Sequence, residues 1–324
     1  MTQEELDNKL ITAAKHGNTE TIIGIIDSGA DVNAYSPNGY TAITSAASFG
    51  HTDCVRQLLK GGADIDQPDG EGETALMKAV LRGRLGTVVL LLKNRADLNK
   101  TDMRGSTALL LACSDRQENS VIVRELIEAG ADVNIPDSKG ITSLMNLLRF
   151  NGTEALIKIL IEHGADINAV NSSGETPLIY ACRYRMASTV KRMLYRGADV
   201  HARDTEGRTP LLEACKNIYV NEDTVKALLN AGADSNDTDP GGMTPTMCLA
   251  LNRGNIELMT LLVNAGADIY AVNKEGQSAQ DILEERHPDK YSEWIEETVV
   301  KPQRERLKNE DSAKGSITGY EFDI

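Results

Sequence analysis

The stretch Gly29-Ala30-Asp31-Val32-Asn33 decides the fold, because closely similar copies of it return seven times along the chain. The steps between successive copies are 33, 33, 35, 34, 33, 35 and 34 residues, and the copies start at Gly29, Gly62, Arg95, Gly130, Gly164, Gly197, Gly232 and Gly266. A second marker, Gly-x-Thr, keeps the same phase at Gly39, Gly72, Gly105, Gly140, Gly174, Gly207 and Gly242. Two markers in phase over most of 324 residues indicate a repeat protein.

One unit, residues 171–204, shows what each repeat encodes. Small polar residues and Gly174 predict a turn, and Thr176-Pro177 predicts a helix start, since Thr caps a helix and Pro suits its first position. Apolar and small residues then predict a short helix, and a second helix ends at Gly197, where glycine favours a left-handed cap. Each repeat is therefore expected to hold two helices and a protruding turn.

The order Asp-x-x-Gly-x-Thr-Pro-Leu, a small-residue helix, and Leu-Leu-x-x-Gly-Ala-Asp-Val-Asn resembles the ankyrin repeat, most closely at 204–236 and 171–200. The resemblance covers roughly residues 5–300 and implies an all-α solenoid of stacked helix-turn-helix units with protruding turns. The tetratricopeptide repeat has the same period, but it fits this sequence poorly. Its first helix characteristically carries Trp, Gly and Tyr, and it has no Gly-Ala-Asp turn.

The phase divides the chain into an ankyrin array over 1–300, about nine repeats including caps, and a polar tail over 301–324. Residues 1–35 and 273–300 are expected to be capping repeats, the first with a polar outer face and the last closed by a helix carrying Trp294, the only tryptophan. Two departures stand out. Arg95 replaces the glycine that usually ends the second helix, which predicts strain at a left-handed backbone position. Insertions between helices fall near 115–119 and 218–221.

Charge and cysteine usage narrow the function classes. The net charge of −14 disfavours non-specific binding to nucleic acid or to an anionic membrane. No two of the five cysteines lie closer than 33 residues, which is typical of reduced, structural thiols rather than of a metal or redox motif. The start of the chain lacks the features of a signal peptide and no apolar run approaches 18 residues, so a cytoplasmic location is expected.

The sequence contains little that indicates catalysis. The Gly-x-Gly-x-x-Ala pattern of a dinucleotide-binding loop matches the residues Gly70-Glu71-Gly72-Glu73-Thr74-Ala75. Such a loop needs an apolar strand before it, and no such strand precedes these residues. The five histidines show no recurring spacing with Ser, Asp or Glu, and the aspartate of Gly-Ala-Asp occurs in all eight copies, as scaffold residues do. We therefore expect a non-enzymatic protein with no cofactor and no metal.

Candidate binding residues are those that break the repeat on its concave side. The resemblance implies that this face is lined by residues next to the turn glycine and by those nine and ten positions after it. Aromatic side chains and arginines, the typical residues of binding hot spots, are frequent there. The residues expected to contact a partner are Phe49, Arg82, Arg104, Arg149, Phe150, Arg183, Tyr184 and Arg208.

The favoured function is a protein-binding scaffold or inhibitor that engages a partner protein through its concave face, without binding nucleic acid or membrane directly. An alternative is an acidic inhibitor, of an immunity or anti-defence type, that mimics nucleic acid and captures a basic DNA-binding protein. The last six residues alternate Tyr320, Phe322 and Ile324 with acidic residues, which suggests that the tail itself docks in the arginine-containing groove, in cis or on a neighbouring molecule.

Overall fold

The computed structural model describes residues 2–114, 120–150, 152–184 and 186–301. These residues form helices joined by turns, and the one β pairing among them is an isolated bridge between Val272 and Ser278. The chain divides into two compact units, Met1–Tyr180 and a second that starts at Ala181, with the boundary inside α11 (Pro177–Arg183). None of the described helices combines the length and the apolar character needed to cross a membrane.

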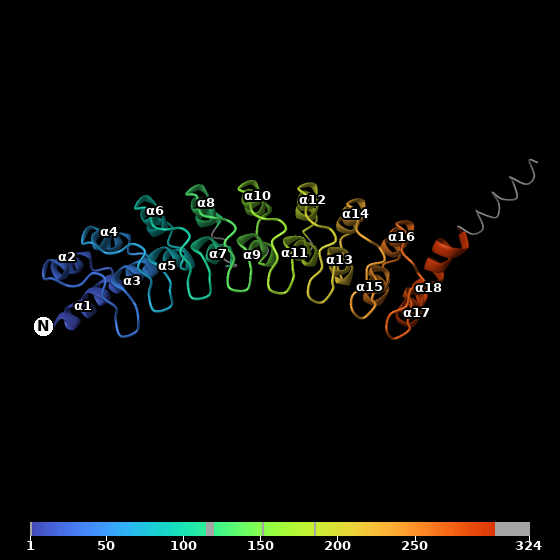
Figure 1. Cartoon of the computed structure of the whole chain (residues 1–324), viewed down its shortest axis with the longest axis horizontal. Coiled ribbons are helices and arrows are strands. Elements are labelled where there is room, and N and C mark those ends of the chain that lie inside the picture. Colours follow the sequence, from blue (N-terminus) through green and yellow to red (C-terminus); the bar gives the residue numbers. More distant parts are fainter. Residues whose placement is uncertain (1, 115–119, 151, 185, 302–324) are drawn as a thin grey trace, which may run out of the picture. The chain divides into compact units, whose positions relative to one another are not determined.

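In the first unit the helices form two layers (Figure 1). The first helices of successive repeats pack side by side in one layer, the second helices pack in the other, and the turns project beyond the first layer (Figure 1). The first helices are α1 (Gln3–His16), α3 (Ala42–Phe49), α5 (Ala75–Leu81), α7 (Ala108–Cys113) and α9 (Ser143–Arg149). The second helices are α2 (Thr19–Asp27), α4 (Thr52–Lys60), α6 (Leu85–Lys93), α8 (Ser120–Glu128) and α10 (Glu154–Glu162).

The second unit repeats this pairing of helices. Its first-layer helices α13, α15 and α17 pack in sequence, α12 packs on α14, and α18 closes the end against α16 and α17. The bounds are α12 (Ala187–Tyr195), α13 (Pro210–Lys216), α14 (Glu222–Asn230), α15 (Pro245–Asn252), α16 (Ile256–Asn264), α17 (Ala279–Arg286), α18 (Pro288–Ile295) and the π-helical turn η1 (Glu296–Val300). The predicted helix-turn-helix solenoid is confirmed.

Threonine caps start the first helices as the sequence predicted. The Thr74 hydroxyl accepts a hydrogen bond from the backbone N–H of Met77 at 3.3 Å, which satisfies an amide that the helix leaves without a partner. The same contact recurs at Thr41, Thr107, Thr142, Thr176, Thr209 and Thr244. The cap and the buried apolar positions that follow it explain why these short helices form at the same place in each repeat.

The aspartates of the eight Gly-Ala-Asp copies are scaffold residues. Each carboxylate accepts a hydrogen bond from the backbone N–H two residues further along the chain. Neighbouring repeats are also tied together here, because the Asn33 side chain accepts from the backbone N–H of Asp64 at 2.9 Å. Asp66, Asn99, Asn134 and Asn236 hold the next repeats in the same way.

Arg95 has a φ of 64°, the one positive value at a non-glycine position in the described chain. The strain predicted at this position is therefore present, because a side chain there crowds the backbone. The backbone N–H of Arg95 still closes the helix end by donating to Leu92 at 3.0 Å. The helix of this repeat therefore ends with a residue in the left-handed backbone region, as the other repeats do, although arginine is unfavourable there.

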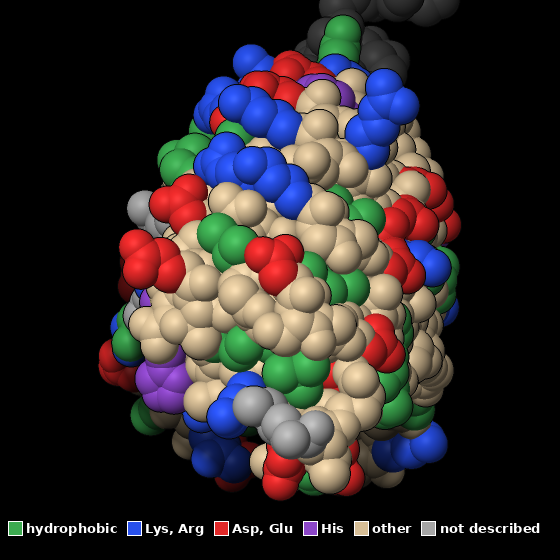
Figure 2. Space-filling model, turned by 90° about the vertical axis from the view of Figure 1, so that its left-hand side faces the viewer, with side chains coloured by type: hydrophobic (Ala, Val, Ile, Leu, Met, Phe, Trp, Pro, Cys, Tyr) green, Lys and Arg blue, Asp and Glu red, His purple; other side chains and the backbone are tan. Residues whose placement is uncertain are grey.

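The two ends of the array are covered differently. The opening helix α1 buries Leu10, Ile11, Ala13 and Ala14 and turns a face of mixed charged and polar side chains outward (Figure 2). At the closing end, Trp294 is fully buried on α18, and its capping role stays a prediction. The limits of the array at residue 300 and of the tail at 301–324 stay predictions, since 302–324 lie outside the described residues.

Candidate functional site

The first unit carries a hollow of about 550 Å³ on its first-helix layer. Its lining comes from three adjacent helices, α1, α3 and α5, and from the turns that precede α3 and α5. Phe49 and Arg82, both predicted binding residues, lie in this lining, and the Phe49 side chain is 48% exposed. Tyr40 and Leu81 add further exposed apolar surface.

A buried lysine organises one wall of the hollow. The Lys78 ammonium contacts Asp69 at 2.8 Å, Glu71 at 3.2 Å and Glu73, and it lies 5.7 Å from the centre of the Tyr40 ring. Burial alone would lower the pKa of Lys78, but the hydrogen bonds to Asp69 and Glu73 outweigh it and hold that pKa above its ordinary value. Lys78 therefore stays charged and joins the turn to α5.

The same three carboxylates have the spacing of a candidate cation site, since their oxygens lie within 4.8 Å of one another. The lysine ammonium already lies among them and supplies the positive charge. The residues that matched a dinucleotide loop on paper form the turn of this network, where Asp69 accepts from the backbone N–H groups of Glu71 and Glu73. This geometry explains the Gly-x-Gly pattern as a repeat turn.

The other predicted residues of the first unit lie on its surface. Arg104 is exposed in the turn before α7, and its backbone carbonyl accepts a hydrogen bond from Ser138 of the next turn at 2.8 Å. Arg149 is exposed at the end of α9, with its guanidinium 5.5 Å from the centre of the half-buried Phe150 ring. This cation–π contact makes Arg149 and Phe150 one composite surface feature.

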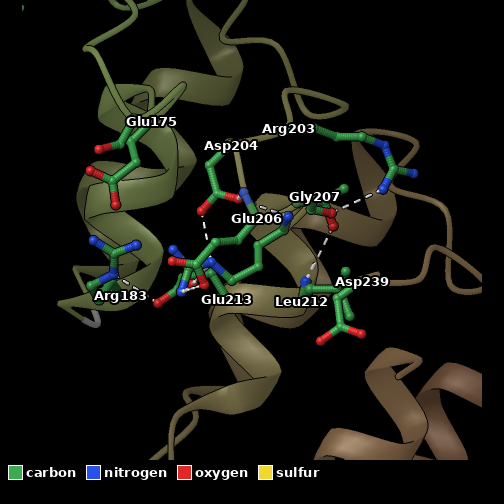
Figure 3. Close-up of polar contacts among 12 residues, drawn as sticks. Glu175, Arg183, Arg203, Asp204, Glu206, Gly207, Leu212, Glu213 and Asp239 are labelled. Atoms are coloured by element: carbon green, nitrogen blue, oxygen red, sulfur yellow. Dashed lines mark hydrogen bonds and ion pairs between the residues drawn. The ribbon is translucent and has the colours of Figure 1, made fainter. Parts of the chain in front are cut away.

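In the second unit, two predicted arginines belong to an internal ion-pair network. The Arg183 Nε atom donates to Glu213 at 2.7 Å, and the two side chains point toward one another (Figure 3). Arg208 pairs with Asp204 at 2.7 Å and contacts Glu206 at 3.0 Å and Glu213 at 3.5 Å. Burial acts against the charged form of Arg208, but its hydrogen bond to Asp204 and the charge of Glu213 raise its pKa. Arg208 therefore joins the turn before α13 to that helix, and Arg183 joins α11 to α13. The role of both arginines in partner binding stays a prediction.

Tyr184, the remaining predicted residue, is 37% exposed at the end of α11. Phe49, Phe150 and Tyr184 all follow the turn glycine of their repeat by ten residues. The fold brings Phe49 together with Arg82, Arg149 together with Phe150, and Arg183 close to Arg208 through Glu213. The first two pairs lie in the first unit, and the third lies in the second unit.

Sequence reasoning did not single out Lys78 or Glu213, which organise these two networks. Both residues stand six positions after the turn glycine, where other repeats place Ser45, Leu111, Asn146, Tyr180 and Cys248. A charged side chain at a position that is otherwise small, apolar or neutral was the available signal. Such a residue requires buried partners, because an isolated charge is costly to desolvate.

All five cysteines are buried with free thiols, in agreement with their predicted structural role. Burial raises the pKa of Cys113 to about 12, an effect that a hydrogen bond to Ser143 partly offsets. Burial, with the nearby Glu213 charge, also raises the pKa of Cys182. Thiols in this state are poor nucleophiles, since the reactive thiolate is disfavoured.

Comparison with known proteins agrees with the repeat geometry. A family model described as ankyrin repeats (3 copies) matches residues 10–102, 109–204 and 184–273. Among curated proteins, none matches the chain.

Proposed function

The chain belongs to the ankyrin repeat family, and we propose that it binds a partner protein through the first-helix face of its repeats. Ankyrin repeats generally mediate protein–protein interaction, which makes a binding scaffold the coarse function of this chain. We further propose that the chain is non-enzymatic and acts on its partner by occupying or positioning it.

The observation that carries this proposal is the placement of aromatic side chains at the ends of first helices. Phe49 and Tyr184 are 48% and 37% exposed, although burial in a core would stabilise them more. Phe150 is half-buried and has an arginine over its ring. Exposed aromatic residues beside arginine are frequent among residues that contribute most to binding energy.

The second helices offer a matched control for this proposal. Tyr195 lies on α12 and is 89% exposed, so it is a tyrosine of the same unit on the other helix layer. The full chain, Tyr184→Ser and Tyr195→Ser would each be used to capture partners from the native cell, with quantification by mass spectrometry. We expect Tyr184→Ser to weaken capture about tenfold and Tyr195→Ser to leave it unchanged. Equal effects of the two substitutions would contradict binding through the first-helix face.

The acidic-mimic alternative rests on the net charge of −14 and makes a different prediction. A nucleic-acid mimic would capture basic DNA-binding proteins through carboxylates, and capture would fall steeply between low and high salt. Binding centred on Phe49, Phe150 and Tyr184 would depend only modestly on salt. A salt series on the captured complex therefore separates the two functions, and inhibition of the partner's own activity separates an inhibitor from a scaffold.

The proposal that the tail competes with a partner concerns Tyr320, Phe322 and Ile324, which lie outside the described residues. A chain ending at Val300 tests it directly. If the tail docks on the first-helix face, removal should tighten partner binding and reduce hydrogen-exchange protection around Phe150 and Tyr184. Unchanged affinity and protection would show that the tail does not dock there.

A further inference from the structure

The hollow of the first unit has chemistry of its own, separate from the general aromatic character of the face. Aromatic and aliphatic surface lies at its centre, because Phe49, Tyr40 and Leu81 are 48%, 43% and 36% exposed. The Phe49 ring is held by stacking on His51, with the ring centres 6.2 Å apart and the planes at 13°. A held but exposed ring can accept an apolar side chain with little loss of conformational entropy.

The charged groups of the hollow are not evenly matched. Its carboxylates gather on the wall around Lys78, where Glu71 and Glu73 both contact the ammonium. Lys15, on α1, and Arg82, at the end of α5, are exposed in the lining, and neither makes an ion pair with any residue that the structure describes. The positive charges that remain available to a ligand therefore come from the two helices on either side of α3, which carries Phe49.

From this charge distribution we infer that the hollow binds an extended peptide segment of a partner in which an apolar side chain is flanked by acidic residues. The apolar side chain packs on Phe49 and Leu81, and the acidic side chains pair with Lys15 and Arg82. This inference rests on the proposed function and deepens it by specifying the partner segment. On a chain with a net charge of −14, the Lys15 and Arg82 side chains give an acidic segment a local attraction that favours its binding in this hollow.

The test uses the full chain and fluorescein-labelled synthetic peptides, with binding followed by fluorescence anisotropy. The probe is SGDEFEDGS, and its controls are SGKKFKKGS and SGDEAEDGS. We expect the acidic probe to bind about tenfold more tightly than either control, because each control lacks one of the two complementary features. Equal or tighter binding of the lysine peptide would overturn the inference and indicate that Glu71 recognises a cation.

Substitutions then locate the binding. Lys15→Ala and Arg82→Ala should each weaken the probe about threefold, and Phe49→Ala should weaken it about tenfold. Tyr195→Ser, far along the chain on α12, is the control that should have no effect. Unchanged affinity in the Phe49 and Arg82 variants would place any binding outside the hollow and overturn the inference.

These substitutions remove exposed side chains, and circular dichroism checks that each variant remains folded. Partner capture that depends on Tyr184 together with no selective peptide binding would refute the inference while the proposed function stands. Partner capture that does not depend on Tyr184, with selective peptide binding retained, would refute the proposed contribution of the second unit's first-helix face and leave the hollow as the binding site.

Discussion

Lys78 in the first unit and Glu213 in the second occupy the same position of the repeat and carry opposite charges. Around Lys78 the turn supplies three carboxylates, whereas around Glu213 the turn supplies Arg208 and the preceding repeat supplies Arg183. In both repeats the turn aspartate accepts the same two backbone N–H bonds. The comparison shows that one backbone turn tolerates either charge, provided that the surrounding side chains change with it.

Lys78 and Glu213 differ in how much neighbouring charge each of them neutralises. Substituting each residue should therefore change the free energy of unfolding by a different amount. Lys78→Met leaves Asp69 and Glu73, whose side chains are 1% and 15% exposed, without their cation. We expect a loss of about 3 kcal/mol in the free energy of unfolding, because uncompensated buried charge is costly. Urea unfolding measures it, and hydrogen exchange should show the loss in α5 and its neighbours. A loss below about 1 kcal/mol would mean that water already screens these carboxylates.

Glu213→Gln should cost less, about 1–2 kcal/mol, because Arg208 keeps its contact with Asp204. The glutamine retains an acceptor for Arg183, and only the charge is lost. The same urea experiment applies, with exchange followed in α13 instead of α5. A loss as large as that of Lys78→Met would contradict the idea that the contacts of Arg208 with Asp204 and Glu206 limit the cost.

The thiols beside Glu213 provide a comparison at high pH. Burial raises the pKa of Cys248 from 9.0 to about 12, and Cys182 and Cys215 are shifted in the same direction. A raised pKa favours the protonated folded state, so this contribution is complete below pH 9 and is lost as the pH rises from 9 toward 12. At pH 10 each such thiol should lower the free energy of unfolding by about 1 kcal/mol.

The measurement is the slope of unfolding free energy against pH between 8 and 10 for the wild-type chain and for Cys248→Ala. The variant should have the shallower slope, whatever its absolute stability. Cys113→Ala is the matched variant in the first unit, where burial raises the pKa to a similar value. Identical slopes for all three chains would show that the thiols do not titrate on unfolding.

The smallest expected effect lies in the row of side chains that ties repeats together. Asp66 occupies a position where Asn33 and Asn99 stand in neighbouring repeats, and it accepts from the backbone N–H of Asp97. Burial, together with the charges of Asp97 and Asp64, raises the pKa of Asp66, although the Asp97 hydrogen bond opposes the shift. Protonation therefore favours the fold, and this contribution is lost as the pH rises through the raised pKa.

Asp66→Asn should keep the hydrogen bond and remove the charge. We expect a gain of less than about 1 kcal/mol at pH 7, because the site is largely open to solvent, and no gain near pH 3. Thermal unfolding at both pH values measures it, with Asn99→Asp as the reverse variant. A loss of stability at pH 7 for Asp66→Asn would show that the carboxylate is the better acceptor here.

The sequence by itself determined the repeat phase, the helix starts at threonine, the turns and the strained backbone at Arg95. These features depend on contacts within about four residues, such as the Thr74 hydroxyl with the Met77 amide, and local chemistry therefore specifies them. The tertiary structure decided which charged side chains remain available to a binding partner. Arg82, Arg183 and Arg208 are all expected on the binding face from their positions in the repeat, but Arg183 and Arg208 contact Glu213, whereas Arg82 lines a hollow. Arg183 meets Glu213 across 30 residues of chain, a pairing that only the stacking of repeats brings about.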